Sequence, residues 1–453
     1  MNTISQRIAR FTSELRWEEL PNDVKEKSKV TLLHNLGMAL AGIPLASAAQ
    51  SYANCLQERG VNASARLLSN GLAATPDTAA LANAALMHAR AQDDVYFPGL
   101  THSGSVMTPA ALAIAESLNA SGQEVLTALV LGSEACAAIC HGYGVESAKR
   151  GFRPTGVFGV FASTVAVARL LGLDATRTAH AIGIAASCGS GVAQPWVASS
   201  QEWQFQIGMA SRNGILAARL AAAGVTGASD ALEGVAGFYR AFAGSAEGSD
   251  KVATELGRVW RSLDVTYKPF PVCAILQAPV TRAIELAVKT DLKVSEISSV
   301  RLYLNPTEAA IPGTDTEGPY QATGATLMSA QFCLSVALSK RTVQGSDLQR
   351  YNDPELLRLI KRTKVIADAS LGTRSFKLQI DMSDGSTVAH IENNIGEPFN
   401  WTAEETIANL KRILSELPFD NVGFSQFVDT IMNAENVSAK TIVDVCLQQQ
   451  RVV

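Results

Sequence analysis

The chain has 453 residues, of which 47% are hydrophobic and 18% are charged, and its formal net charge is −4. This length exceeds one compact core, so it predicts two or three domains with room for a buried site. The weakly acidic balance lacks the basic footprint of a nucleic-acid-binding protein, and we expect no nucleic-acid partner.

The N-terminal residues and the cysteines indicate in which compartment of the cell the protein is expected. Residues 1–7 lack the apolar core of a signal peptide, and the apolar runs elsewhere are interrupted by Arg, Glu, Gly or polar residues before they reach membrane-spanning length. An odd number of widely spread cysteines favours buried, reduced thiols over a disulfide framework. We therefore expect a cytoplasmic protein without a membrane span. The seven cysteines are Cys55, Cys136, Cys140, Cys188, Cys273, Cys333 and Cys446.

Two of these cysteines have a spacing that resembles a metal-ligand pair. Cys136 and Cys140 lie one helical turn apart, and His141 is adjacent. No second ligand cluster with suitable spacing follows, so we interpret the pair as a packed helix face and expect no bound metal.

A polar loop at residues 91–104 separates two Ala-rich helical runs and contains Asp93, Asp94, Tyr96 and His102. Loops on rigid helices often carry the chemistry of a protein. Thr108 and the proline after it predict a new helix there, which places His102 a few residues before a helix N-terminus, where partial positive charge favours an anionic ligand. The loop can also be interpreted as an exposed connection with a solvated histidine.

Helical patterning dominates the chain as far as about residue 260. Ser121 and Glu124 form a predicted capping box. Residues 160–171 read as a helix closed by Gly172, with a new start at Asp174, and residues 208–223 read as a helix closed by Gly224.

The character of the chain changes after Trp260. Residues 267–273 form a Pro-stiffened connector, and β-rich segments follow at 300–304, 376–382 and 387–391, the last two joined by a hairpin signal at 383–386. Helical patterning returns at Thr402. We predict a mainly α protein with an all-helical domain, residues 1–265 with 400–453, and a smaller α+β lid domain, residues 266–399.

Short motifs in a fixed order connect this chain to a known family. With these motifs over nearly its whole length, the chain resembles the MmgE/PrpD family, whose members dehydrate, decarboxylate or epimerise small carboxylic acids. The resemblance implies a homodimer, no metal or organic cofactor, and a di- or tricarboxylate site in the cleft between an all-helical domain and an α+β lid. The motifs are Thr-His-Ser-Gly at 101–104, Gly-Phe-Arg-Pro-Thr-Gly at 151–156, the helix start at 208–214, Lys-Pro-Phe-Pro at 268–271, Ala-Gln-Phe at 330–332 and Glu397-Pro398.

The resemblance carries over residue by residue. The family's Asp-Phe-Asp-Asp stretch corresponds to residues 92–95, so that Asp94 matches and the register of Asp93 is ambiguous. Tyr96 stands where a Thr is common. His102 and Lys268 match the family's pattern.

Several other positions depart from the family's dehydratases and decarboxylases. Arg153 replaces the His of the Gly-(Trp/Phe)-His-Pro-Thr-Gly motif. The Lys and His that usually precede the third motif's glycine fall near Trp203 and Gln206, and a further His has become Gln277.

The retained residue types suit proton abstraction next to a carboxylate, which needs a base and a fixed cation for the developing negative charge. His102 can act as base or acid near neutral pH, Lys268 can carry positive charge or act as a base when desolvated, and Arg153 can hold a carboxylate bidentately. We assign His102, Lys268 and Asp94 to catalysis, and Arg153, Asp93, Tyr96 and Gln206 to substrate binding.

The resulting prediction is a cofactor-independent, dehydratase-like lyase of a small di- or tricarboxylic acid. An isomerase or epimerase of a dicarboxylate is an alternative, because removal and return of a proton need only His102 and Lys268. A non-catalytic carboxylate-binding homologue is the alternative from another class, motivated by the replaced positions.

Structural interpretations also stand beside these assignments. Arg153 can pair with a structural carboxylate, and Lys268 can lie on the surface, whereas a two-domain site requires Lys268 to face the loop at 92–104. The Ala-rich helices predict a homodimer, because they carry more apolar surface than one domain readily hides. The remaining histidines are expected to be packed or solvated: His34, His88, His141, His180 and His390.

Overall fold

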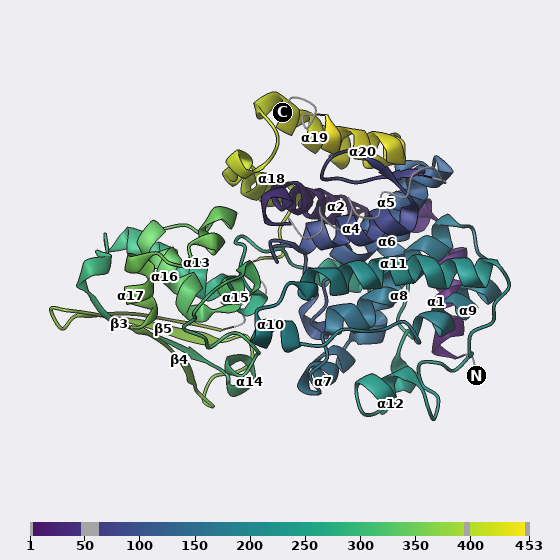
Figure 1. Ribbon diagram of the computed structural model, residues 1–453. Helices are drawn as coiled ribbons and strands as arrows, with labels where there is room; N and C mark the ends of the chain where they lie inside the picture. Colours follow the sequence, from purple (N-terminus) through teal and green to yellow (C-terminus); the bar gives the residue numbers. More distant parts are fainter. Residues whose placement is uncertain (1–2, 47–62, 394–398, 449–453) are drawn as a thin grey trace.

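The computed structural model describes residues 3–46, 63–393 and 399–448. A large helical body carries a smaller α+β part on one side (Figure 1), which confirms the predicted mainly α fold. Cys55 and the Glu397-Pro398 motif lie outside the described residues.

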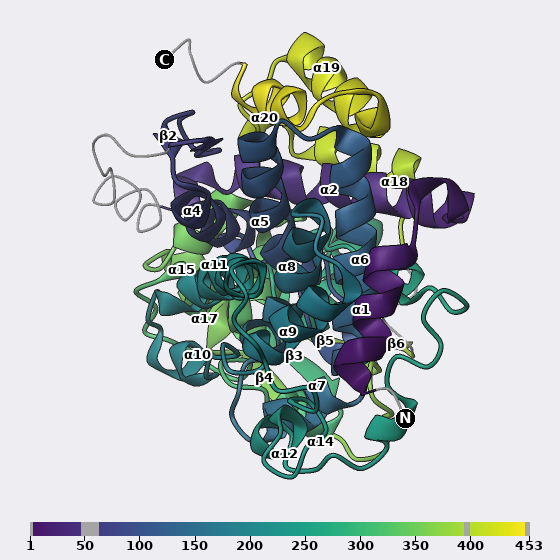
Figure 2. The same cartoon turned by 90° about the vertical axis from the view of Figure 1, so that its right-hand side faces the viewer.

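The body is built around helix α8, Pro154–Leu170, which is surrounded by α5, α6, α9 and α11 (Figure 2). Its run of Val, Phe and Ala side chains is buried on all sides from Pro154 to Ala168, as expected for a helix that is apolar around its whole circumference. The other α-helices among the described residues up to 242 are α1 Ile4–Glu14, α2 Asn22–Ala41, α4 Pro76–His88, α5 Ser103–Leu118, α6 Gly122–Cys140, α7 Tyr143–Lys149, α9 Ala175–Ala185, α10 Gln194–Ala198, α11 Glu202–Ala222 and α12 Phe238–Phe242.

Close packing of α8 against α11 depends on a glycine. A Cβ atom at Gly214 of α11 would lie 2.0 Å from the Oγ of Ser163 on α8, so no larger residue fits without movement. Helix α6 passes through the same core. Among the described residues it is the one helix long and apolar enough to span a membrane, and 89% of its apolar window is buried inside the protein.

The predicted helix ends before Gly172 and Gly224 are confirmed to within one residue, but the predicted starts at 160 and 208 are wrong, because α8 begins at Pro154 and α11 at Glu202. Helix α9 begins after the N-cap Asp174, and α6 begins with the capping box of Ser121 and Glu124. The body also contains a two-stranded antiparallel hairpin that the sequence pattern did not indicate, formed by β1 Ala65–Arg66 and β2 Ala73–Ala74.

Helix α5 begins earlier than predicted. Thr108 is not its N-cap, because the helix runs from Ser103 and Pro109 lies inside it. The first free N–H groups, those of Gly104 and Ser105, donate to the carboxylate of Asp94 at 2.9 and 3.1 Å. This carboxylate replaces the local cap that the sequence pattern favoured. His102 consequently occupies the N-cap position itself.

The α+β part contains a four-stranded sheet in the order β4-β3-β5-β6, with helices on one face (Figure 1). The predicted hairpin is confirmed, because β5 and β6 pair antiparallel. Strand β4 was not predicted; it pairs parallel with β3. The elements are α13 Gln277–Lys289, β3 Ile297–Leu304, α14 Pro306–Ala309, α15 Thr323–Met328, α16 Ala330–Lys340, α17 Pro354–Ile360, β4 Thr363–Ala367, β5 Phe376–Met382 and β6 Thr387–Glu392.

The C-terminal helices return to the body. Leu410 on α18 packs against Gly37 of α2, where a Cβ would lie 2.5 Å from the leucine side chain. One hydrophobic cluster accordingly joins the body to residues 410–447, and a second holds most of the α+β part, from Phe270 to Phe399. The helices are α18 Ala403–Arg412, α19 Asn421–Met432 and α20 Ala439–Leu447.

The chain enters the α+β part beside the loop at 91–104. Val95 and Thr266 exchange backbone hydrogen bonds of 2.9 Å in both directions, and Tyr267 N–H donates to the carbonyl of Phe399 at 2.8 Å. These bonds fix the connector to the body immediately before Lys268.

Candidate active site

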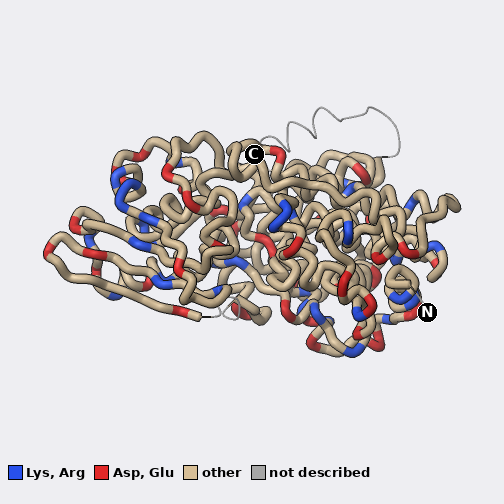
Figure 3. Tube along the Cα trace, turned by 90° about the horizontal axis from the view of Figure 1, so that it is seen from below, with Lys and Arg blue, Asp and Glu red and all other residues tan. Residues whose placement is uncertain are grey.

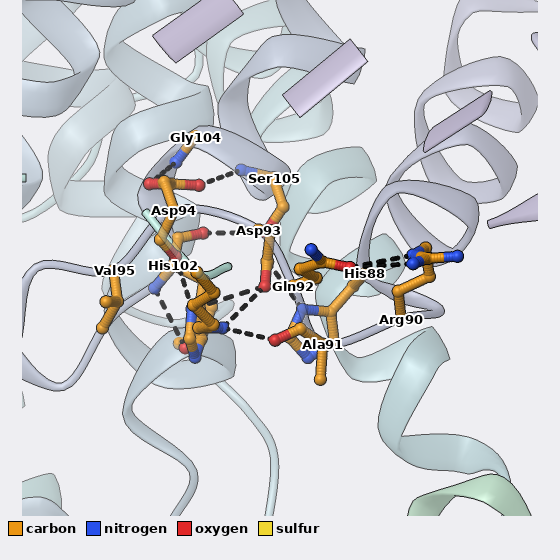
Figure 4. Close-up of polar contacts among 12 residues, drawn as sticks. His88, Arg90, Ala91, Gln92, Asp93, Asp94, Val95, His102, Gly104 and Ser105 are labelled. Atoms are coloured by element: carbon orange, nitrogen blue, oxygen red, sulfur yellow. Dashed lines mark hydrogen bonds and ion pairs between the residues drawn. The ribbon is translucent and has the colours of Figure 1, made fainter. Parts of the chain in front are cut away.

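A buried ionisable cluster lies where the connector meets the loop at 91–104 (Figure 4). Asp93 is at its centre and is fully buried. One carboxylate oxygen, Oδ2, lies 2.6 Å from His88 Nδ1, and the other, Oδ1, accepts from Lys268 Nζ at 3.0 Å. Asp93 therefore connects a histidine from the end of α4 with a lysine from the connector.

Lys268 and His102 lie together, as a site between the two parts of the chain requires. Lys268 Nζ is 3.3 Å from His102 Nδ1, and it donates to the carbonyl of Ala91 at 2.7 Å. The Lys268 side chain is 2% exposed. The surface position considered for it is therefore wrong.

His102 is oriented by backbone contacts. Its Nδ1 lies 2.6 Å from the carbonyl oxygen of Asp94, a distance that assigns the proton to Nδ1, because a carbonyl can only accept. Its Nε2 then carries a lone pair and is the basic atom. The His102 side chain is 17% exposed, whereas those of Asp93, Lys268 and His88 are at most 2% exposed.

Asp94 contacts the backbone more than the ionisable groups. Its carboxylate accepts from the N–H groups of Gly104 and Ser105 (Figure 4). It also accepts from the side-chain amide of Asn35 at 3.0 Å. Its main-chain carbonyl holds His102. Asp94 thus positions both the start of α5 and the imidazole.

Arg153 is 6% exposed and lies against the far side of His88. Its Nη2 contacts His88 Nε2, and its Nη1 donates to the carbonyl of Trp203 and, at 3.2 Å, to Gln206 Oε1. The guanidinium also lies over the ring of Trp196, 4.9 Å from its centroid. Three of its five N–H donors thus have protein partners.

Two further residues from the sequence analysis lie outside the cluster. The Tyr96 hydroxyl pairs with His141 Nδ1 at 2.7 Å, on the side facing α6 and Arg261 rather than on the side of Lys268. Gln277 stabilises the connector, because its amide donates to the carbonyls of Phe270 and Val272 at 2.9 and 2.8 Å. Gln277 therefore contributes to the position of Lys268 indirectly.

His88 is the member of the cluster that sequence reasoning missed, since it was grouped with the packed or solvated histidines. A usable signal was present: His88 ends an Ala-rich helix and lies five residues before Asp93. An imidazole at the last turn of a buried helix, close to a carboxylate, is a candidate partner for that carboxylate.

The pKa values in the cluster follow from burial and neighbouring charge. Burial lowers the pKa of His88 to about 4, and it also lowers the pKa of His102 well below its usual range, with a further contribution from Lys268. Burial opposes ionisation of Asp93, but His88 and Lys268 outweigh it and hold the pKa of Asp93 well below its usual range. Burial and the charge of Asp93 raise the pKa of Asp94 to about 6.

These shifts predict acid sensitivity. As the pH falls from about 6.5 towards 4, we expect the free energy of unfolding to decrease, because His34 and His88 have pKa values of about 4 when folded and near 6.5 when unfolded. The unfolded state therefore binds more protons in this window. Buried carboxyls act in the opposite direction, since burial raises the pKa of Asp94 to about 6 and also raises the pKa values of Glu116, Glu134 and Glu308. The lowered pKa values of four histidines and of Asp93 act together against them. Denaturant titrations at pH 7 and pH 5 measure the effect, and a higher midpoint at pH 5 contradicts it.

The charges elsewhere are interspersed. Lys and Arg lie among Asp and Glu over the trace in Figure 3. Within the described ranges, no group of three or more His, Cys, Asp or Glu side chains is arranged to hold a metal ion. Cys136 and Cys140 are buried in the α6 core, as a packed helix face requires.

The described residues thus place a buried cluster of histidine, lysine and aspartate side chains between the helical body and the α+β part. Two family models match the chain: the MmgE/PrpD N-terminal domain over residues 6–249 and the MmgE/PrpD C-terminal domain over residues 270–412. The chain belongs to the MmgE/PrpD family and is an enzyme of that type.

Curated relatives are similar over most of the chain. Cis-aconitate decarboxylase of Aspergillus terreus is 24% identical over 466 aligned positions, which cover 96% of this chain and 94% of that protein. The cis-aconitate decarboxylase of Mus musculus is 25% identical over 85% of this chain and 81% of its own length. That of Homo sapiens is 29% identical over 60% of this chain and 57% of its own length.

Proposed function

We propose that the protein is a cofactor-independent lyase that removes a proton next to a carboxylate of a small di- or tricarboxylic acid. The observation that carries the proposal is the geometry of His102: a neutral imidazole with its Nδ1 proton held by the Asp94 carbonyl and its Nε2 lone pair available as a base. The similarity to cis-aconitate decarboxylases supports the substrate class.

The cluster supplies each part of this chemistry. His102 Nε2 takes the proton, and the negative charge that develops on the substrate is stabilised by the nearby Lys268 ammonium. Asp93 keeps that ammonium in place at 3.0 Å. In a dehydration the imidazolium gives the proton to the leaving hydroxyl, which departs as water. In a decarboxylation no proton is removed first: the bond to the carboxyl carbon breaks, carbon dioxide leaves without a proton, and the remaining carbanion takes a proton from solvent through His102.

An isomerase or epimerase remains the second candidate. The observation that favours it is the replacement of acid–base residues around Arg153, where Trp203 and Gln206 contribute a carbonyl and an amide to the guanidinium. Removal and return of one proton need only His102 and Lys268. The buried pairing of Asp93 with Lys268 argues against the non-catalytic alternative, because a buried ion pair adds little stability by itself.

One experiment separates these functions. The protein is incubated with a panel of di- and tricarboxylic acids in deuterated water, and the products are followed by proton NMR. Dehydration, decarboxylation and epimerisation each leave a different spectrum, and exchange at the carbon next to a carboxylate reports proton abstraction alone. A His102→Asn variant is the control, because it keeps a backbone-facing amide without the basic Nε2. Absence of exchange, elimination and decarboxylation for the whole panel overturns the proposal.

Arg153 is proposed to bind a substrate carboxylate through the donors that its protein partners do not use. We expect Arg153→Ala to raise KM by about tenfold or more, since a hydrogen bond to a charged group contributes about 1.5–3 kcal/mol. Steady-state kinetics with the substrate identified by NMR measures the effect. Gln206→Ala, which removes a neighbour of the guanidinium, should change KM less. An unchanged KM for Arg153→Ala contradicts the assignment, as does improved elimination by Arg153→His. Asp93, Tyr96 and Gln206 remain predicted contributors to substrate binding.

We further propose a cytoplasmic homodimer. The proposal rests on the apolar, Ala-rich composition of the helical region; the most exposed valines, Val235 at 93%, Val422 at 65% and Val197 at 61%, are single positions on separate elements. Reduced thiols suit the cytoplasm, and the cysteines of the described segments are free. Light scattering at micromolar concentration is expected to give twice the mass of one 47.9 kDa chain, and a monomeric mass contradicts the dimer.

A further inference from the structure

The side chains of Arg153, His88 and Asp93 form a continuous line of polar contacts beside His102, the proposed base. Arg153 Nη2 contacts His88 Nε2, and His88 Nδ1 contacts Asp93 Oδ2 at 2.6 Å. All three side chains are nearly or fully excluded from solvent. Water therefore does not replace these contacts, and the two ring nitrogens of His88 are satisfied by Arg153 and Asp93.

The guanidinium of Arg153 decides which nitrogen of His88 carries the proton. A guanidinium has only donors, so a hydrogen bond between Arg153 and His88 Nε2 requires a lone pair on Nε2. The single proton of the neutral imidazole is then on Nδ1, where it is donated to Asp93. A protonated His88 would direct an N–H at the guanidinium and would place two cations side by side.

We propose that Arg153 holds His88 as the neutral Nδ1–H tautomer, and that His88 is a positioning residue that keeps the charge of Asp93 directed at Lys268. His88 engages Oδ2 of Asp93, so that Oδ1 is left for Lys268 Nζ at 3.0 Å, while His102 Nδ1 lies at 3.6 Å from the same oxygen. The influence of Asp93 on the protonation of His102, the proposed base, rests on the function proposed above, whereas the tautomer of His88 does not.

The groups that face His88 come from every element packed against it. Asp93 from the loop at 91–104 favours protonation, whereas Arg153 at the start of α8 and Lys268 from the connector oppose it, and burial opposes it most strongly. The His102 ring lies 5.2 Å from the His88 ring, and the edge of Trp203 on α11 closes the remaining side at 5.3 Å. Donation from His88 disperses the charge of Asp93, which weakens its attraction for a proton on His102.

The tautomer is tested directly by long-range proton–nitrogen NMR of the imidazole rings in the full-length protein without substrate. His88, assigned from the signals lost in His88→Asn, is expected to be the neutral Nδ1–H form and to stay so between about pH 5 and 8. In Arg153→Met, which removes the donor and the charge, we expect His88 to titrate at higher pH than in the native protein. An Nε2–H tautomer, or an imidazolium that titrates in the native protein within this range, overturns the proposal.

The positioning role is tested by a matched pair of variants. His88→Asn places an amide near the Nδ1 position and keeps a donor for Asp93, whereas His88→Gln places it near Nε2 and keeps only the partner of Arg153. The acid limb of the kcat/KM profile reports the base of the free enzyme. We expect His88→Gln to shift this limb upward by about half a pH unit or more, because Asp93 regains its full attraction for a proton on His102, and we expect His88→Asn to leave the limb in place.

Other outcomes distinguish failure of the positioning role of His88 from failure of the proposed function. Equal losses of kcat in both variants with an unshifted limb indicate a merely structural role and overturn the positioning proposal. If no substrate is turned over by the native protein, the proposed function fails, and the NMR measurement still decides the state of His88.

Discussion

Replacement of His102 by Asn is expected to lower kcat by about 10²–10⁴-fold, the usual contribution of general acid–base catalysis. The amide can still donate to the Asp94 carbonyl, as His102 Nδ1 does at 2.6 Å, but it provides no basic atom at the position of Nε2. KM should change little, because the residue is assigned to proton transfer rather than to binding. Steady-state kinetics at the pH optimum measures both constants.

The matched control is His390→Asn. His390 is on strand β6, pairs with Glu392 at 3.1 Å and has a 34% exposed side chain, so its loss should leave kcat unchanged. A His102→Asn variant that retains more than about a tenth of the native kcat would require a different base, and Lys268 would be the first candidate.

Replacement of Lys268 by Met should abolish turnover and also destabilise the fold. Lys268 and Asp93 form a buried ion pair at 3.0 Å, and removing one partner of such a pair typically costs about 3–5 kcal/mol because the other charge is left uncompensated. Met keeps most of the side-chain volume, so packing loss contributes little. Denaturant titration at pH 7 measures the free energy of unfolding, and kinetics on the folded fraction measures kcat.

The double variant Asp93→Asn with Lys268→Met separates charge from function. It removes both charges, so we expect it to recover a large part of the stability lost in Lys268→Met while kcat stays low. If the double variant is no more stable than Lys268→Met, the buried charge is not the origin of the destabilisation. If it regains activity, Lys268 is not required for the reaction.

The helices and the main strands followed from local signals. Asp174 as an N-cap, the capping box of Ser121 and the hairpin of β5 and β6 all depend on residues that are neighbours in sequence, and all three are present. The start of α5 was missed because its cap, Asp94, lies nine residues before Ser103 and reaches the helix through tertiary folding. Strand β4 was missed because parallel pairing with β3 depends on a distant partner.

The site shows the same division between local and distant information. His102 and Lys268 were found from their motifs, and their proximity was expected because a site between two parts of the chain requires it. The roles of the acidic residues were not accessible in the same way. Asp93 and Asp94 are adjacent in sequence, yet one faces His88 and Lys268 and the other faces the N-terminus of α5. Only the tertiary direction of each side chain distinguishes a charge partner from a helix cap.

The two contacts of Asp94 come from its side chain and from its main chain, so a substitution at this position can remove one without the other. The carboxylate that begins α5 belongs to the side chain, whereas the oxygen that holds His102 belongs to the main chain. A substitution can delete the first, but every amino acid retains the second. Substitutions at position 94 therefore change the stability of the first turn of α5. The carbonyl that accepts from His102 depends on the backbone conformation, so replacing the side chain does not remove it.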